Sequence, residues 1–227
     1  MACVEQVFYG RQYRGGATVL PRHRHGGSYV AVVLSGGYEE AGDRGLYRVR
    51  AGEAIMHGAF EAHVNRYGAE GAEVLNLELP FWMEPSAARF EVGDVDGVAR
   101  LAERDPREAV EFLMESMVGV VEREGDWPDV LARALVSDPH LRLQEWARAY
   151  GLAEATVSRG FQRVFGVTPS GYRAQVRGRL ACRQAVGGGE SLSMVAAGAG
   201  FCDQAHMTRT VRALTGKTPG AWRREVK

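Results

Sequence analysis

Four of the six histidines, His23, His25, His57 and His63, lie in the first third of the chain. On an extended strand the pattern His23-x-His25 places both imidazoles on one face. His63 from a later strand can join them, which predicts a site with three nitrogen ligands and an open position for a divalent metal ion. The alternative is that these histidines are hydrogen-bonded and line a ligand pocket. His57 falls beside the metal pattern, and we expect it to pack or to line the cavity.

A second group of side chains, in the C-terminal part of the chain, suits nucleic acid. Arg, Gln, Thr and Ser are the residue types that hydrogen-bond base edges and phosphates. They fall outside the apolar stripes of two expected helices, where they would face a partner. The predicted DNA-contacting positions are Ala155, Thr156, Ser158, Arg159 and Arg163 on the first helix and Gln204, Ala205, His206, Thr208 and Arg209 on the second.

The elements that must hold these side chains are marked by one phrase that occurs twice. Residues 166–173 read GVTPSGYR and residues 216–223 read GKTPGAWR, an offset of 50 positions. In each copy the Gly suits the left-handed position after a helix end, Thr is a good N-cap, and Pro fits the first helical position. The repeat predicts two similar helical units.

Each unit has the pattern of a helix-turn-helix. In the first, Val157 and Phe161 begin a buried stripe that continues to Phe165, and Gly151 permits a tight turn before it. The second unit has a stripe that starts at Met207 and a turn at Gly200. Residues 172–185 are expected to form one helix that fixes the separation of the units. An ordinary helix pair is the alternative for either unit alone, but the shared closing phrase favours two helix-turn-helix units.

The zero net charge hides an asymmetry between two halves of the chain. Residues 129–227 hold fifteen Lys and Arg against seven Asp and Glu, while residues 1–128 hold thirteen against twenty-one. A basic half that also contains the repeat indicates a nucleic-acid partner for that half.

Residues 129–227 resemble the DNA-binding domain of AraC/XylS-type transcription regulators. The resemblance is most specific in Val195-Ala196-x3-Gly200-Phe201-x-Asp203-Gln204-x-His206, followed by Arg209, Gly216, Thr218-Pro219 and Trp222-Arg223. It implies two helix-turn-helix units that enter successive major grooves on one face of the duplex. By position it also implies which residues face bases: Ala155, Ser158 and Arg159 in the first unit, and Gln204, Ala205, His206, Thr208 and Arg209 in the second.

Residues 1–84 have the pattern of a strand-rich domain. The segment 29–34 is β-rich and runs into Ser35-Gly36-Gly37, which predicts a turn, and further turn signals follow at short spacing. The histidine spacing resembles the cupin barrel, in which a Glu would follow the His-x-His pair. That position falls on Tyr29 or Val30, so the carboxylate ligand of the cupin pattern is missing.

Residues 85–128 contain the start signal Asp105-Pro106, with Asp as N-cap and Pro at the first helical position. An apolar stripe follows from Val110 to Val121 and predicts an amphipathic helix. The stripe is expected to pack either on the barrel or against a second copy of the chain, which leaves a homodimer open.

Together these patterns predict an α+β multidomain protein: a cupin-like β-barrel over 1–84, a helical linker over 85–128, and an all-α domain with two helix-turn-helix units over 129–227. The expected function is a sequence-specific transcription regulator whose barrel senses a small-molecule effector, with double-stranded DNA as partner. The alternative is a cupin metalloprotein or metal-sensing regulator that uses His23, His25 and His63. No enzyme activity and no membrane partner are expected. The three cysteines, an odd number without close pairing, and the absence of a secretory pattern predict a cytoplasmic protein.

Overall fold

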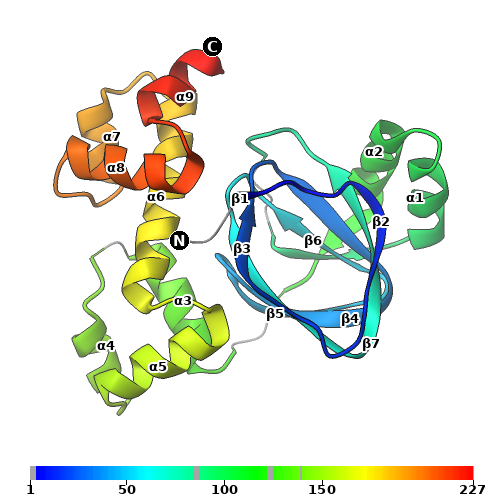
Figure 1. Cartoon of the computed structure of the whole chain (residues 1–227), viewed down its shortest axis with the longest axis horizontal. Coiled ribbons are helices and arrows are strands. Elements are labelled where there is room, and N and C mark those ends of the chain that lie inside the picture. The colour runs from blue at the N-terminus through cyan, green and yellow to red at the C-terminus, as the bar shows by residue number, and fades with distance from the viewer. Residues whose placement is uncertain (1–3, 84–86, 122–124, 139, 227) are drawn as a thin grey trace. The chain divides into compact units, whose positions relative to one another are not determined.

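The computed structural model describes residues 4–83, 87–121, 125–138 and 140–226 (Figure 1). The chain divides into two compact units, Met1–Gly42 with Leu46–Glu124, and Gly125–Lys227 with Asp43–Gly45. The first unit is a sheet domain and the second a helical domain. Within the described ranges, no helix has the length and apolar character that crossing a membrane requires. Cys3 lies outside the described residues, whereas Cys182 is buried and Cys202 exposed, both as free thiols.

The sheet domain is built from nine strands and two helices among the described residues. In chain order they are β1 Val4–Glu5, β2 Gly10–Arg14, β3 Val19–His25, β4 Tyr29–Gly42, β5 Gly45–Arg50, β6 Glu53–His57, β7 Ala62–Glu78, β8 Arg89–Val92, α1 Val95–Ala102, α2 Pro106–Ser116 and β9 Met117–Gly119.

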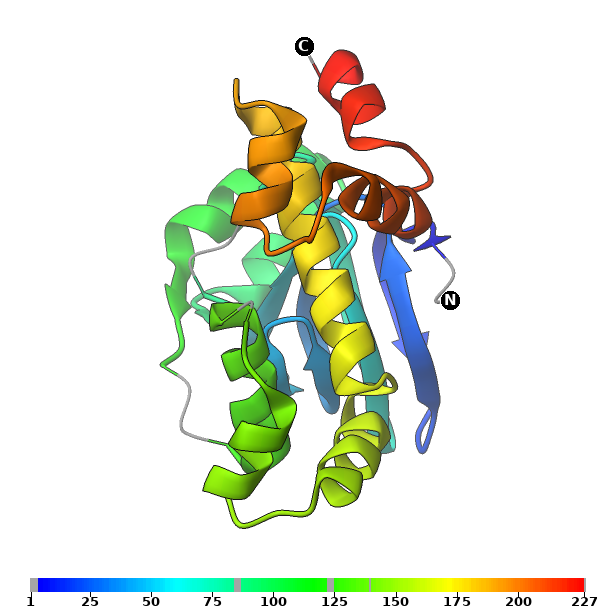
Figure 2. The same ribbon diagram turned by 90° about the vertical axis from the view of Figure 1, so that its left-hand side faces the viewer.

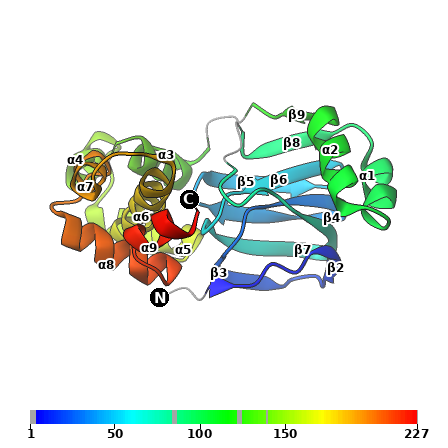
Figure 3. The same cartoon turned by 90° about the horizontal axis from the view of Figure 1, so that it is seen from above.

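The strands form one open sheet, in the order β1-β3-β7-β4-β6-β8-β9, with β2 also paired to β7 and β5 to β4. The predicted strand-rich domain is confirmed, but the closed cupin-like barrel is not. Among the described residues the hydrogen-bonded order starts at β1 and ends at β9, and no pair joins those two strands. Strand β1 is only two residues long and pairs in parallel with β3. Even so, the sheet is strongly curved (Figures 1 and 3).

The curvature follows from two long strands that run side by side. Strands β4 and β7 pair over most of their length, with register shifts between Val33 and Ser35 and between Gly36 and Tyr38. The turn predicted at 35–37 is therefore wrong, since the strand continues through this segment as a bulge, which bends it. Gly36 has φ +68°, and a Cβ there would collide with the carbonyl oxygen of Gly71, so glycine is required at this bend.

The two faces of the sheet have separate cores. On one face Val30, Val32 and Leu75 pack with residues of α1 and α2, including Leu113. On the other face the alternate residues of the same strands, among them Tyr29, Val33, Tyr38 and Val74, form a second cluster. This alternation is the period of two that a strand imposes. The second face therefore carries the histidines of β3 and β7.

The segment that the sequence assigned to a helical linker also contains strands. Residues 89–119 form β8, α1, α2 and β9 and belong to the first compact unit. Asp105 caps α2 by accepting from the Arg107 and Glu108 backbone N–H groups, with Pro106 at the first position, as predicted. The predicted apolar stripe from Val110 to Val121 does not lie on one helix, because α2 ends at Ser116 and β9 follows. Leu113 is fully buried against the sheet, whereas Val118 and Val121 are 66% and 92% exposed. A homodimer through this stripe remains a prediction.

The helical domain consists of seven helices in the described residues. They are α3 Trp127–Ser137, α4 Leu143–Ala149, α5 Glu154–Phe165, α6 Pro169–Gly187, α7 Leu192–Gly198, α8 Gln204–Thr215 and α9 Pro219–Glu225. Within this domain α6, yellow in Figure 2, is one continuous rod that connects α4 and α5 at one end with α7 and α8 at the other. At about 1.5 Å per residue, its 19 residues span roughly 28 Å.

Local signals set the helix ends as the repeated phrase predicts. Gly166 and Gly216 take left-handed conformations after α5 and α8, with φ +69° and +81°. Thr168 and Thr218 then cap α6 and α9, each accepting from a backbone N–H three residues on, and Pro occupies the next position. The two units of the sequence repeat are thus two units of the structure.

Candidate nucleic-acid interface and histidine cavity

Helices α5 and α8 show the same pattern of exposure at the 50-residue offset of the sequence repeat. Val157 and Met207 are buried at equivalent positions, as are Phe161 and Val211. Between and around them the exposed and half-buried positions coincide from the first turn to the third. Each helix therefore buries one stripe in its own unit and leaves the same remaining faces open.

The predicted DNA-contacting residues lie on those open faces. Ser158 and Thr208, at equivalent positions, are half-buried. The other eight are exposed: Ala155, Thr156, Arg159, Arg163, Gln204, Ala205, His206 and Arg209. At the start of α8, Asp203 accepts a hydrogen bond from the His206 backbone N–H at 2.6 Å, and Cys202 Sγ lies 3.2 Å from His206 Nδ1. The first turn of α8 is thus fixed by a side-chain cap, whereas α5 starts after Ala153 without one.

The first helix of each unit supports the second across a tight turn. Helix α4 buries Trp146 and Ala147, and α7 buries Val195 and Ala196. Gly151 and Gly200 turn the chain with φ +64° and +75°, values that glycine adopts without strain. Viewed as in Figure 3, α4 and α7 overlap on the same side of α6, so the two units repeat along this rod.

Two arginines on α6 have a role that the sequence did not indicate. Arg173 donates to the Leu141 carbonyl oxygen at 2.5 Å, just before α4, and Arg177 donates to the Gly200 carbonyl oxygen at 3.0 Å, in the turn of the second unit. Each therefore ties one helix-turn-helix unit to the rod. Nothing local in the sequence shows that these arginines will meet a distant carbonyl oxygen.

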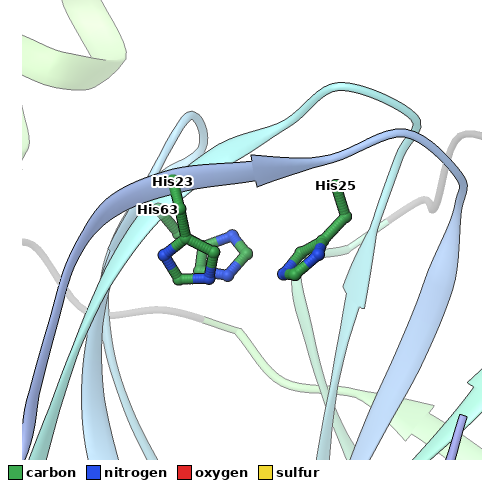
Figure 4. Close-up of side chains that lie close together, drawn as sticks. All are labelled: His23, His25 and His63. Atoms are coloured by element: carbon green, nitrogen blue, oxygen red, sulfur yellow. The ribbon is translucent and has the colours of Figure 1, made fainter. Parts of the chain in front are cut away.

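The predicted histidines converge on one face of the sheet domain (Figure 4). His23 and His63 are directly opposite each other on β3 and β7, with ring centroids 4.4 Å apart. His25 follows on the same face of β3, 4.9 Å from the His23 ring and 5.4 Å from the His63 ring. The ligand nitrogens of the three residues lie within 4.8 Å of one another. They line a cavity of about 240 Å³ together with tyrosine, glutamate and asparagine side chains.

The surroundings of these rings favour neutral imidazoles. Burial, and then the neighbouring His23, lowers the pKa of His25 to about 4. Burial, with His57 as the next cause, lowers the pKa of His63 well below its ordinary value. Burial also raises the pKa of Tyr29, whose hydroxyl lies 3.4 Å from His63 Nε2. At neutral pH the rings of His25 and His63 therefore keep a nitrogen lone pair, which is the form that binds a metal.

A buried carboxylate lies near the histidines, further along β4 than the position where the cupin pattern would place one. Glu40 on β4 is 2% exposed, accepts from Asn65 Nδ2 at 3.0 Å, and lies 3.6 Å from His57 Nε2. Glu40, His57 and His63 form a second group whose ligand atoms lie within 4.8 Å of one another. The cupin spacing pointed to Tyr29 or Val30 for the carboxylate. The sequence alone does not point to Glu40. Its place near the histidines follows from the register of β4 on β7, which pairs Glu40 with Asn65, two residues after His63.

Comparison with known proteins agrees with the helical domain. Residues 146–225 match the family described as "Helix-turn-helix domain". A search of curated proteins finds no match to the chain.

Solved structures resemble either the helical domain or the whole chain at low identity. The C-terminal domain of AraT, a response regulator from Geobacillus stearothermophilus, is 16% identical, with 46% of this chain and 88% of that chain covered and a TM-score of 0.42. The DNA-binding domain of AdpA, in complex with a target DNA, is 20% identical, with 44% and 93% covered and a TM-score of 0.42. ToxT from Vibrio cholerae O395 is 8% identical, with 96% and 97% covered and a TM-score of 0.45. At these values the similarities transfer no function to this chain.

Proposed function

The C-terminal part of this chain is a helix-turn-helix domain of AraC/XylS-type transcription regulators, and on this premise we propose how the protein works. It binds one promoter site through α5 and α8 together, and its N-terminal sheet domain senses a small-molecule effector. Because its target is chromosomal DNA, we place the protein in the cytoplasm.

The observation that carries the proposal is the matched exposure of α5 and α8 along one rod. Both helices leave the same positions open at an offset of 50 residues, and α6 joins their units. Successive major grooves on one face of a duplex recur about every 34 Å. The length of α6, roughly 28 Å, is of the scale that places two helices in neighbouring grooves.

Within each helix we assign roles by side-chain chemistry. Arg159 and Arg209 occupy equivalent exposed positions, and each can hydrogen-bond a guanine edge with two donors. Gln204, His206 and the hydroxyl residues suit single base or phosphate contacts, and Arg163 suits a phosphate. Ala155 and Ala205 can meet only a thymine methyl group, so we expect less sequence selectivity opposite them.

For effector sensing, the cavity on the second face of the sheet is the candidate site. Its lining includes His23, His63, Glu40 and Asn76, with Tyr38 among the aromatic groups. A cavity of about 240 Å³ with this lining suits a small polar ligand or an ion more than a bulky apolar one. An effector can act only by binding more tightly to one arrangement of the protein than to another. The cupin-like identity of this domain is part of the same proposal.

Selection of bound sites from a random duplex library by the tag-free, full-length protein tests the DNA-binding role. We expect one enriched site of roughly 15–20 base pairs, about two turns of duplex, whose binding weakens steeply with salt. Replacing Arg159 or Arg209 by Ala should each weaken binding to that site by about 1–3 kcal/mol and relax the preference at separate base positions.

Arg100→Ala is the matched control, because Arg100 is an exposed arginine on α1 of the sheet domain. It should leave the affinity and the selected site unchanged. Equal weakening of random and selected duplex by Arg159→Ala and Arg209→Ala would refute the base-reading assignment.

A second candidate, a cupin metalloprotein that carries a DNA-binding domain, is favoured by the convergence of His23, His25 and His63. It differs from a regulator in what the metal does. Metal-dependent turnover of a substrate by the protein, with no effect of the metal on its affinity for DNA, would support this candidate.

A further inference from the structure

The histidine cavity contains more ligand atoms than the His-x-His pattern and His63 provide. Two groups meet at His63: one with His23 and His25, the other with Glu40 and His57. In both groups the ligand atoms lie within 4.8 Å of one another. A metal with nitrogen ligands at about 2.1 Å in tetrahedral geometry needs them about 3.4 Å apart, so small side-chain rotations close either group around an ion.

Hydrogen bonding leaves nitrogen atoms of the three-histidine group available. His23 Nδ1 lies 2.9 Å from the Pro21 carbonyl oxygen. A carbonyl only accepts, so Nδ1 carries a proton, and in the neutral tautomer that this bond selects Nε2 has the lone pair. This arrangement is common in metal-binding histidines, because it fixes both the tautomer and the ring.

Each of the other two rings has one buried nitrogen without a hydrogen-bond partner among the described residues. These atoms are Nδ1 of His25 and Nδ1 of His63. His63 is 3% exposed. Burial of a polar atom without a partner is costly, and most such atoms in folded proteins have one. Coordination of a cation by such a nitrogen removes this cost.

Glu40 adds the negative charge that favours a cation here. Its carboxylate is buried beside His57 and belongs to the group that shares His63. Three neutral imidazoles bring no charge to balance a divalent ion, and in a buried site an adjacent carboxylate stabilises that ion strongly. Imidazole nitrogens with one carboxylate are a donor set suited to Zn²⁺, Co²⁺, Ni²⁺ or Fe²⁺ and poorly suited to Ca²⁺ or Mg²⁺.

We propose that the sheet domain binds one divalent transition-metal ion through His23, His25 and His63, that Glu40 provides the balancing carboxylate, and that this ion is the effector. Only the last clause rests on the proposed regulatory function. The site differs from the cupin sequence pattern, since its carboxylate comes from Glu40, towards the end of β4, and not from the position of Tyr29 or Val30 at the start of that strand.

Titration of tag-free, chelator-treated full-length protein with Co²⁺ and Zn²⁺ tests the binding site. We expect one ion per chain by calorimetry and a visible Co²⁺ absorption spectrum with tetrahedral or five-coordinate character. His25→Ala, at the half-buried ligand, should weaken binding at least about 100-fold, and Glu40→Gln, which keeps shape and removes charge, about 10- to 100-fold. His140→Ala, which removes an exposed histidine of the helical domain, should change nothing.

Less than about 0.1 ion per chain, or unchanged affinity in both His25→Ala and Glu40→Gln, would overturn the metal site. Should His25→Ala not fold, Glu40→Gln and the spectrum of the wild-type protein still decide the question.

Affinity for the selected duplex, measured with and without Zn²⁺, tests the effector clause. We expect a change of about 5- to 150-fold, the usual range of coupling between two sites, that disappears in His25→Ala. Metal binding with no change in DNA affinity would overturn the effector role and leave the site standing. Specific DNA binding by a protein that takes up no metal would overturn this inference alone, and failure to bind any duplex would overturn the proposed function.

Discussion

The two helix-turn-helix units share a layout but are stabilised by different means. The first has a large aromatic core, in which Phe161, Phe165 and Tyr172 contact one another and are fully buried. At the equivalent places the second has the smaller Val211 and Thr215, and its buried Trp222 donates from Nε1 to Thr215 Oγ1 at 2.8 Å. One exposure pattern is thus compatible with quite different cores.

The starts of the helices are better capped in the second unit than in the first. In the second unit Ser191 caps α7 and Asp203 caps α8, each accepting from a backbone N–H three residues on. In the first unit α4 starts after Arg142 and α5 after Ala153, neither with a side-chain cap bond. The first unit therefore depends on long-range packing and the second more on local hydrogen bonds. Three predictions test this difference, from the largest effect to the smallest.

Phe161→Ala should destabilise the helical domain by about 3–5 kcal/mol, because it leaves a cavity among rings that pack on one another. Val211→Ala, at the equivalent position of the second unit, should cost less, because it removes fewer buried atoms. Chemical denaturation followed by amide hydrogen exchange, resolved by peptide, would measure both. Equal loss of protection in the two variants would contradict the difference in cores.

Gly160→Ala should destabilise the first unit by about 1–3 kcal/mol through overpacking. A Cβ at Gly160 would lie 2.5 Å from Cζ2 of Trp127 on α3, a contact that requires the indole to move. Gly198→Ala is the matched control, since a Cβ there meets nothing within 4 Å. It should be neutral or stabilising by up to about 1 kcal/mol. Thermal unfolding should show a lower midpoint for Gly160→Ala and an equal or higher one for Gly198→Ala, and an unchanged or higher midpoint for Gly160→Ala would count against the Trp127 contact.

Exchanging cap residues should produce the smallest effects. Ser191→Ala removes the oxygen that accepts from the Met194 backbone N–H and should cost about 1 kcal/mol. Ala153→Ser places such an oxygen at the extended position before α5 and should gain a similar amount or less. Hydrogen exchange of the first turns of α7 and α5 would report each change. No loss of protection in α7 after Ser191→Ala would show that this cap contributes little.

In the sheet domain the sequence predicted the histidines but not the path of β4. The histidines were found because His23 and His25 are two residues apart on one strand, and the alternation of side chains is a local property. The bulge at 35–37 was predicted as a turn, because a Ser-Gly-Gly segment is compatible with either. The pairing of β4 with β7 on both sides of it decides in favour of the bulge. The position of Glu40 opposite Asn65 depends on the same pairing.

The helical domain was predicted more completely, and the reason is physical. Left-handed Gly166, the cap at Thr168 and the stripe from Val157 to Phe165 each depend on residues within one or two turns, so the chain determines them locally. What only the tertiary structure decided are contacts between distant residues: Glu40 beside His57, Arg177 on the Gly200 carbonyl, and Trp127 against Gly160. Such contacts follow from the register of strands and the crossing of helices, which no short stretch of sequence contains.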